Sequence, residues 1–316
     1  MSIFKRLSIK HVVLLLVLVT ALYGAGRLYY RVTGGFTISN ISSEFPNDER
    51  WAIAPFSPTA QASVDSIMDQ KFTYLGKGCQ SYVFLSEDGN YVLKFFKYQR
   101  FRLQPWLNYL TFLPGMTDYR NGKIEKKRAK VEGVFSSWKI AFENLQPETG
   151  LVFVHLNKSS NLNKTLRIFD KMGFEHLLDA DQFEFLIQRK ADMLCAYIDD
   201  LMAKGQTEES KQLISNILTL VVSEYQRGYA DNDHALMQNT GVMDGKPVHI
   251  DVGQFVKDDS VKDPAFYKQE LFSKTYKFRY WLEEQHPQLA KYLEAELRLI
   301  IGNNFSTMIP HFKQHE

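Results

Sequence analysis

The stretch Phe72–Phe96 reads FTYLGKGCQSYVFLSEDGNYVLKFF, a pattern typical of paired β-strands. The runs Tyr82–Leu85 and Tyr91–Leu93 are rich in the β-branched and aromatic residues that favour strands. Between them, Glu87–Asn90 has the Asp-Gly composition of a hairpin turn. We therefore expect three antiparallel strands, with the two glycines of LGKG between the first strand and the second.

Two features of this region suit a ligand that carries phosphate. Gly76 and Gly78 have no Cβ, so backbone N–H groups there can approach a phosphate closely, although glycines between strands are also typical of a simple turn. Val92 and Lys94 share one face of the last strand. With Val83 they predict a surface where the valines cover an adenine and the Lys94 ammonium reaches phosphates. The alternative is an edge-strand lysine with its charge in water.

Beyond this stretch the chain changes from strands to helices. In chain order, we expect a helix over 122–145, a strand at 151–156, a hairpin with strands at 166–169 and 174–178, a strand at 183–188, a helix at 208–226 ended by Gly228, a strand at 247–252, and two helices over 264–303 broken at His286-Pro287. This order predicts an α+β fold with a sheet-rich front and a helical back, divided near 188–190.

Acidic and amide side chains gather in two loops of the second half. The loop 228–239 contains Asp231, Asp233 and Asn239, and the segment 248–255 contains Asp251 followed by Val-Gly. Carboxylate and amide oxygens near a strand end suit a divalent cation, although either loop alone is also typical of a polar surface turn. These residues are therefore our candidates for a metal site.

Together the four motifs resemble the protein-kinase-like superfamily over about 72–255. LGKGCQSYVF is similar to its glycine-rich loop, with Ser81 in place of the third glycine. The 18 residues from Asp233 to Asp251 are close to the usual gap between the catalytic-loop aspartate and the metal-binding aspartate. The resemblance implies a two-lobed fold with an antiparallel-sheet N-lobe and a small helical C-lobe. It also implies ATP as the nucleotide, with Mg²⁺ or Mn²⁺.

The resemblance assigns roles to single residues. Asp251 would bind the metal that bridges the phosphates, and Asn239 would be the second metal ligand. Asp233 would orient or deprotonate the acceptor hydroxyl, and Lys94 would neutralise phosphate charge. The backbone of Gln188-Arg189-Lys190 would form the hinge that pairs with adenine.

The sequence also departs from the family pattern. Asp231-Asn232-Asp233 replaces His-Arg-Asp, which makes Asp231 a competitor for the catalytic role. Asn239 lies six residues after Asp233, where five is usual, so one extra residue must bulge. The segment 256–264 is too short for a long activation segment, which favours kinases of small molecules, sugars or lipids. Three glutamates are candidates for the acidic partner of Lys94: Glu132 first, then Glu143 and Glu125.

The amino-terminal segment predicts a single membrane anchor. Residues 11–26 contain no Lys, Arg, Asp or Glu, and apolar and aromatic residues up to 30 extend the run past Arg27. A cleaved signal peptide is the alternative, because basic residues precede a short apolar run and small residues follow it. The excess of positive charge before the run favours an inside amino terminus only slightly, so the side of the membrane that holds the body is undecided.

The composition is that of a folded chain with a basic start. Of the 316 residues, 45% are apolar and 14% aromatic, and the net charge is +2. The first 34 residues hold five bases and no acid, which leaves a mildly acidic body and no indication of nucleic-acid binding. Cys79 and Cys195 are expected to be free thiols. We divide the chain into an anchor or signal peptide (1–31), a linker (32–70), an N-lobe (71–190) and a C-lobe (191–316).

The segment 97–130 is basic and encloses the apolar stretch Trp106–Leu113. It predicts attraction to anionic lipid beside the anchor, a solvated helix start with a packed apolar flap, or a receptor for an anionic substrate. The motifs as a whole suggest a membrane-held phosphotransferase that acts on a hydroxyl of a lipid, glycan or protein. The alternatives are a pseudokinase that binds nucleotide or serves as a scaffold without turnover, and transfer of another group such as a nucleotidyl group.

Overall fold

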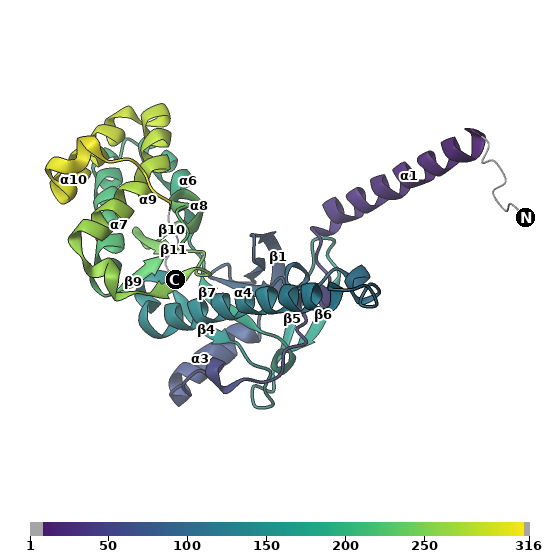
Figure 1. Ribbon diagram of the computed structural model, residues 1–316. Helices are drawn as coiled ribbons and strands as arrows, with labels where there is room; N and C mark the ends of the chain where they lie inside the picture. The colour runs from purple at the N-terminus through teal and green to yellow at the C-terminus, as the bar shows by residue number, and fades with distance from the viewer. Residues whose placement is uncertain (1–8, 313–316) are drawn as a thin grey trace, which may run out of the picture.

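The structure is a computed structural model that describes residues 9–312. Its largest element is a seven-stranded sheet in the order β4-β7-β3-β2-β1-β5-β6 (Figure 1). The strands are β1 (Lys71–Lys77), β2 (Ser81–Ser86), β3 (Tyr91–Phe96), β4 (Leu151–His155), β5 (Thr165–Phe169), β6 (Glu175–Asp179) and β7 (Phe185–Arg189). All neighbours are antiparallel except β1 and β5. The purely antiparallel sheet that we expected is therefore wrong at this edge. The chain returns to β1 by a long connection, and parallel pairing needs such a connection.

The three strands predicted within 72–96 are confirmed as β1, β2 and β3. Their register places Tyr82 opposite Phe95 and Phe84 opposite Leu93. The turn predicted at 87–90 is closed by the Asp88 carboxylate, which accepts hydrogen bonds from the Ser86 hydroxyl at 2.6 Å and from the backbone N–H of Asn90 at 2.9 Å. The strand pairing therefore follows from local pattern and turn chemistry alone.

One face of this sheet is covered by the segment that precedes β1. This segment forms the short helix α2 (Ile38–Ile41) and the helix α3 (Pro58–Met68). Phe36, Ile41 and Met68 are buried in one cluster with the sheet residues Phe84 and Leu93. Residues 32–70 are thus not a linker. Their glycines, prolines and serines shape turns between apolar side chains that bury surface against the sheet.

The helix predicted over 122–145 is present as α4 (Met116–Asn144), and it runs along the sheet (Figure 1). Its apolar stripe packs Val131, Phe135 and Trp138 against Phe96 and Leu186 of the sheet. The stripe is confirmed, but the helix begins earlier than predicted because Gly115 reverses the chain in a left-handed conformation just before Met116.

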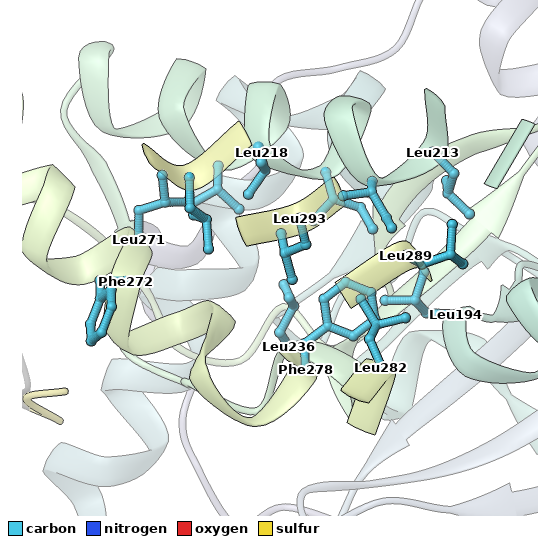
Figure 2. Close-up of a cluster of buried hydrophobic side chains, with 14 of the residues drawn as sticks. Leu194, Leu213, Leu218, Leu236, Leu271, Phe272, Phe278, Leu282, Leu289 and Leu293 are labelled. Atoms are coloured by element: carbon cyan, nitrogen blue, oxygen red, sulfur yellow. The ribbon is translucent and has the colours of Figure 1, made fainter. Parts of the chain in front are cut away.

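The second half of the chain is mainly helical, as predicted. It contains α6 (Leu194–Ala203), α7 (Thr207–Gln226), α8 (Leu236–Asn239), α9 (Pro264–Gln285) and α10 (Pro287–Ile301). Leucines from these helices meet around Phe278 in one buried cluster (Figure 2). The break at His286-Pro287 and the end of α7 before Gly228 are both where the sequence predicts them.

Two small sheets carry the acidic loops. One consists of β8 (Asp192–Met193), β10 (Thr240–Met243) and β11 (Lys246–His249), and the other of β9 (Tyr229–Asp231) and β12 (Phe255–Lys257). The strand expected at 247–252 ends at His249, so 250–254 form a loop between β11 and β12. The pairing of β9 with β12 brings the two acidic loops together.

The first helix, α1 (Ile9–Thr33), projects from the body as a separate rod (Figure 1). At about 1.5 Å per residue its 25 residues exceed the roughly 30 Å hydrocarbon core of a bilayer. Its composition is apolar enough to cross a membrane, and its described side chains are exposed up to Val32. Lys5 and Arg6, which contribute to the expected orientation, lie outside the described residues.

Candidate functional site

Strand register places the predicted nucleotide residues on one face of the sheet. Gly76 lies opposite Val83, Val83 opposite Lys94, and Val92 opposite Gln188. Residues directly opposite each other point to the same side of a sheet, and alternate residues of one strand do so too. All five therefore share the face that meets the helical half, where the Lys94 ammonium donates to the carbonyl of Ile250.

Lys94 is held at the centre of this face by two acceptors. Its ammonium donates to the side-chain oxygen of Gln188 at 2.6 Å and to the carbonyl oxygen of Ile250. Burial lowers the pKa of Lys94 from 10.5 to about 8, and the nearby Asp251 carboxylate opposes that shift. The edge-strand alternative, with the charge in water, is therefore wrong.

Gln188 has a different place from the hinge that we expected. Its side-chain amide bridges the two halves, because Nε2 donates to the carbonyls of Thr149 at 2.5 Å and His249 at 2.8 Å while Oε1 accepts from Lys94. The backbone N–H groups of Arg189 and Lys190 donate to Gly150 and Asn90, both at 2.8 Å. These two amides are occupied by protein carbonyls, so the predicted pairing with adenine does not fit them.

Glu132 is also corrected, because its carboxylate pairs with two arginines and not with Lys94. It forms ion pairs with Arg50 and Arg128, both at 3.1 Å. Of the two alternatives, Glu143 lies 3.8 Å from Lys139 in an exposed pair, and Glu125 is exposed. Sequence spacing defined the helix, but the side of α4 that faces the site depends on tertiary packing.

The glycine-rich loop is held by two basic side chains of the segment after β3. Lys97 donates to the carbonyl of Gly78, and Arg100 donates to the carbonyl of Cys79. A Cβ added to Gly76 or Gly78 would meet no atom within 4 Å, and neither residue has a positive φ. Nothing in the described fold requires glycine at these two positions, which favours a ligand approaching the backbone there. Ser81 begins β2 and is half-buried.

Gln80 reaches from this loop to the Asp251-Val252-Gly253 motif. Its side-chain amide lies against Gly253, and a Cβ at that glycine would overlap it. Gln80 Oε1 is buried and finds no hydrogen-bond partner within residues 9–312. An orphaned buried oxygen is costly, so this amide oxygen is suited to a donor or a cation that the described fold does not supply.

Asp251 lies two residues after β11, and its carboxylate interacts with the charges of Lys94, Asp231 and Asp233. Burial raises the pKa of Asp251 above the ordinary carboxyl value, and the charges of Asp231 and Asp233 add to that shift. Lys94 and the backbone N–H of Gly253, which donates to Oδ1 at 3.2 Å, oppose it. Asp231, Asp233 and Asp251 are therefore close enough for their charges to interact, and Lys94 compensates those charges in part.

Contacts with α4 fix the position of the Asp251-Val252-Gly253 motif. Ser137 on α4 is fully buried, and its hydroxyl donates to the carbonyl of Val252 and accepts from the N–H of Phe255, both at 2.5 Å. Val252 is buried in the cluster under α4. The Asp-Val-Gly motif is thereby tied to the sheet half by a polar bridge that the sequence did not reveal.

Asp231 and Asp233 differ sharply in their surroundings. The Asp231 carboxylate forms a fully buried ion pair with Lys274 on α9 at 3.0 Å, and its other oxygen accepts from the N–H of Asp233 at 3.0 Å. Asp233 is partly exposed and accepts from the N–H of Ala235 at 2.9 Å and from Gln254 Nε2 at 3.4 Å. Asp231 therefore stabilises the loop from its buried side, and Asp233 is the carboxylate that solvent and a substrate can reach.

Asn239 ends α8, whose single turn accommodates the extra residue. Its carbonyl accepts from the N–H of Ile250 at 2.7 Å, which places Asn239 beside the loop 250–254 that contains Asp251. Its side chain is buried, and Nδ2 has no hydrogen-bond partner in the described part of the chain. Within 9–312 no group of three His, Cys, Asp or Glu is arranged for a metal. The candidate cation ligands are therefore the Asp251 carboxylate and the side-chain oxygen of Asn239, the two that the resemblance implies.

Three contributors to this region were missed from the sequence. None of the motifs assigns a role to Gln80, Ser137 or Lys274, and the residues that they contact lie far along the chain. Only Gln80 had a local signal, because it lies inside the glycine-rich loop.

Comparison with known proteins gives structural likeness but no match in sequence. No protein-family model and no curated protein matches the chain. Among solved structures, it is similar to the bifunctional kinase-methyltransferase WbdD, with 14% sequence identity and a TM-score of 0.33. The likeness covers 72% of this chain and 47% of that one, so the chain spans about half of that protein's length.

Proposed function

We propose that this protein is an ATP- and Mg²⁺- or Mn²⁺-dependent phosphotransferase that moves the γ-phosphoryl group to a hydroxyl of a lipid, glycan or protein. The observation that carries the proposal is that Lys94, Asp233 and Asp251 meet from three separate segments around one face of the sheet. A structural role for each alone would not require a half-buried lysine beside a half-buried carboxylate.

The roles follow from charge and position. Lys94 would neutralise phosphate charge, and the open backbone around Gly76 and Gly78 would contact phosphate oxygens. Asp251, with Asn239, would hold the divalent cation, which supplies charge neutralisation for the phosphates. Asp233 would accept the proton of the acceptor hydroxyl as it attacks the γ-phosphorus, while the bond to the leaving ADP oxygen breaks.

The acceptor is proposed to lie at a membrane, because α1 is long and apolar enough to cross one. A body attached directly to such a helix reaches substrates at the bilayer surface or just above it. The lipid or glycan classes therefore fit the tether, and a membrane-bound protein fits it as well.

The test separates nucleotide binding from turnover. The full chain in detergent should gain thermal stability with Mg-ATP and release labelled phosphate or transfer it to lipid or glycan extracts. Asp251→Asn, which keeps shape and removes charge, should lose the metal-dependent stabilisation. Asp233→Asn should keep it and lose transfer by roughly 100-fold or more, the usual scale for a catalytic base.

Each outcome has a definite meaning. An unchanged Mg-ATP stabilisation in Asp251→Asn contradicts the metal site. Binding without any turnover in the parent chain contradicts catalysis and leaves a nucleotide-binding pseudokinase. Exposed Asp244, in its surface pair with Arg189, provides a matched control for Asp→Asn, and that variant should behave like the parent.

A further inference from the structure

We propose that the body has a second membrane contact beside α1: an aromatic and basic surface that lies on the anionic headgroups of the bilayer that α1 crosses. We call it the juxtamembrane surface and define it by three groups of side chains: Trp106, Tyr109 and Phe112; Lys123, Lys126 and Lys130; Met172 and Phe174. The inference requires α1 to be in a membrane and does not depend on phosphotransfer.

The first group is a set of large apolar side chains that the fold leaves in solvent. Trp106, Tyr109 and Phe112 are 52%, 78% and 77% exposed. The backbone that carries them is nevertheless fixed, because Arg120 on α4 donates to the Asn108 side chain at 2.8 Å and Leu107 is buried. Exposed aromatic side chains on an ordered support are typical of a binding surface, and Trp and Tyr favour the membrane interface.

The second group supplies positive charge next to these aromatics. The segment 97–130 holds nine bases and two acids. Lys123, Lys126 and Lys130 are exposed, and their spacing of three and four residues places them on one side of α4. Basic residues that flank exposed aromatics match the headgroups of anionic lipids, and this complementarity favours a bilayer over an uncharged protein partner.

The third group connects the surface to the helix. At the tip of the β5–β6 hairpin, Lys171 donates to the carbonyl of Arg31 in the last turn of α1 at 2.9 Å. The neighbouring Met172 and Phe174 are exposed. On the other side, Arg102 donates to the carbonyl of Ser42 at 2.9 Å, in the segment that follows α1.

These contacts place the surface where the membrane would be. The hairpin tip contacts the end of α1, and the segment before α4 contacts α2 just after it. Figure 1 shows α1 leaving the body at the end where α4 begins, away from α10. A single helix lets the body tilt, whereas a second contact fixes its orientation to the bilayer.

The experiment uses the full chain in vesicles of phosphatidylcholine, with or without phosphatidylglycerol. In a background of Cys79→Ser and Cys195→Ser, Phe112→Cys carries an environment-sensitive fluorophore. Leu299→Cys on α10, an equally exposed apolar position far from α1, is the matched control. We expect the label at 112 to shift to shorter wavelength and to be quenched several-fold more by headgroup-level nitroxide lipid than the label at 299.

Charge provides the second arm. The excess quenching at 112 should be larger with phosphatidylglycerol, and Lys123→Glu, Lys126→Glu and Lys130→Glu together should remove that increase. A label at 112 that stays water-like in both vesicles overturns the proposal and indicates a protein occupant instead. Equal quenching at 112 and 299 also overturns it, because the body would then have no preferred face toward the bilayer.

Discussion

Lys94 is a cation placed where burial opposes its charge. Its acceptors are an amide and a carbonyl, and the nearby Asp251 compensates its charge only in part. The pKa of Lys94 falls from 10.5 to about 8 as a result. A ligand that brings phosphate to this position would restore the charged form, so nucleotide binding and protonation of Lys94 should be linked.

We expect the affinity for Mg-ATP to fall as the pH rises through about 8, because free protein then loses the ammonium that the phosphates require. Stability should respond in the opposite direction. The unfolded chain holds this proton up to pH 10.5, so between about 8 and 10.5 it binds more protons than the folded chain, and the unfolding free energy rises.

Titration of nucleotide affinity across this pH range provides the measurement. Lys94→Met should bind more weakly and lose the pH dependence near 8. Lys246 is exposed, so Lys246→Met removes a lysine of the same type, retains Lys94 and serves as the control. An affinity that stays constant across this range in the parent would contradict the linkage.

At the scale of elements, α9 supports the acidic loop through one buried ion pair. Lys274 donates to the backbone carbonyl of Asp231 at 3.2 Å and to its carboxylate at 3.0 Å. The same carboxylate accepts from the N–H of Asp233. The position of the accessible Asp233 thus depends on Lys274, a residue about forty positions further along the chain.

Lys274→Met should lower the unfolding free energy by about 3–5 kcal/mol, because it leaves the Asp231 carboxylate buried without a counter-charge. The double variant Lys274→Met with Asp231→Asn should recover part of that loss, since it removes the unpaired charge. Chemical unfolding in detergent measures both variants. Additive losses in the double variant would show that the two side chains do not interact.

At the scale of the whole molecule, the segment before β1 belongs to the sheet half. Phe36 is 4% exposed and packs edge-to-face on Tyr82 and Phe84, at ring-centroid distances of 5.4 and 5.2 Å. Tyr82 also donates to the carbonyl of Gly35. The residues directly after α1 are therefore part of the core of the sheet half.

Phe36→Ala should reduce the unfolding free energy by about 3–5 kcal/mol, as expected for a buried aromatic removed from a core. Phe112→Ala removes the same group from an exposed position and should change stability by no more than about 0.5 kcal/mol. Thermal or chemical unfolding of both in detergent makes the comparison. If both variants changed the unfolding free energy by equally small amounts, residues 32–70 would be a linker after all.

Local pattern was sufficient for most of the elements and for naming the candidate residues within them. Strand alternation, the Asp-Gly turn and the helical stripe around Trp138 depend on neighbours in the chain, so Lys94, Asp233 and Asp251 were readable in order. Tertiary packing decided which of their neighbours point at them. It turned Glu132 toward arginines, placed Gln188 beside Lys94, and paired Asp231 with Lys274. Those contacts join residues far apart in the chain, and such partners are selected by how helices and sheets rotate against each other when they bury their apolar faces.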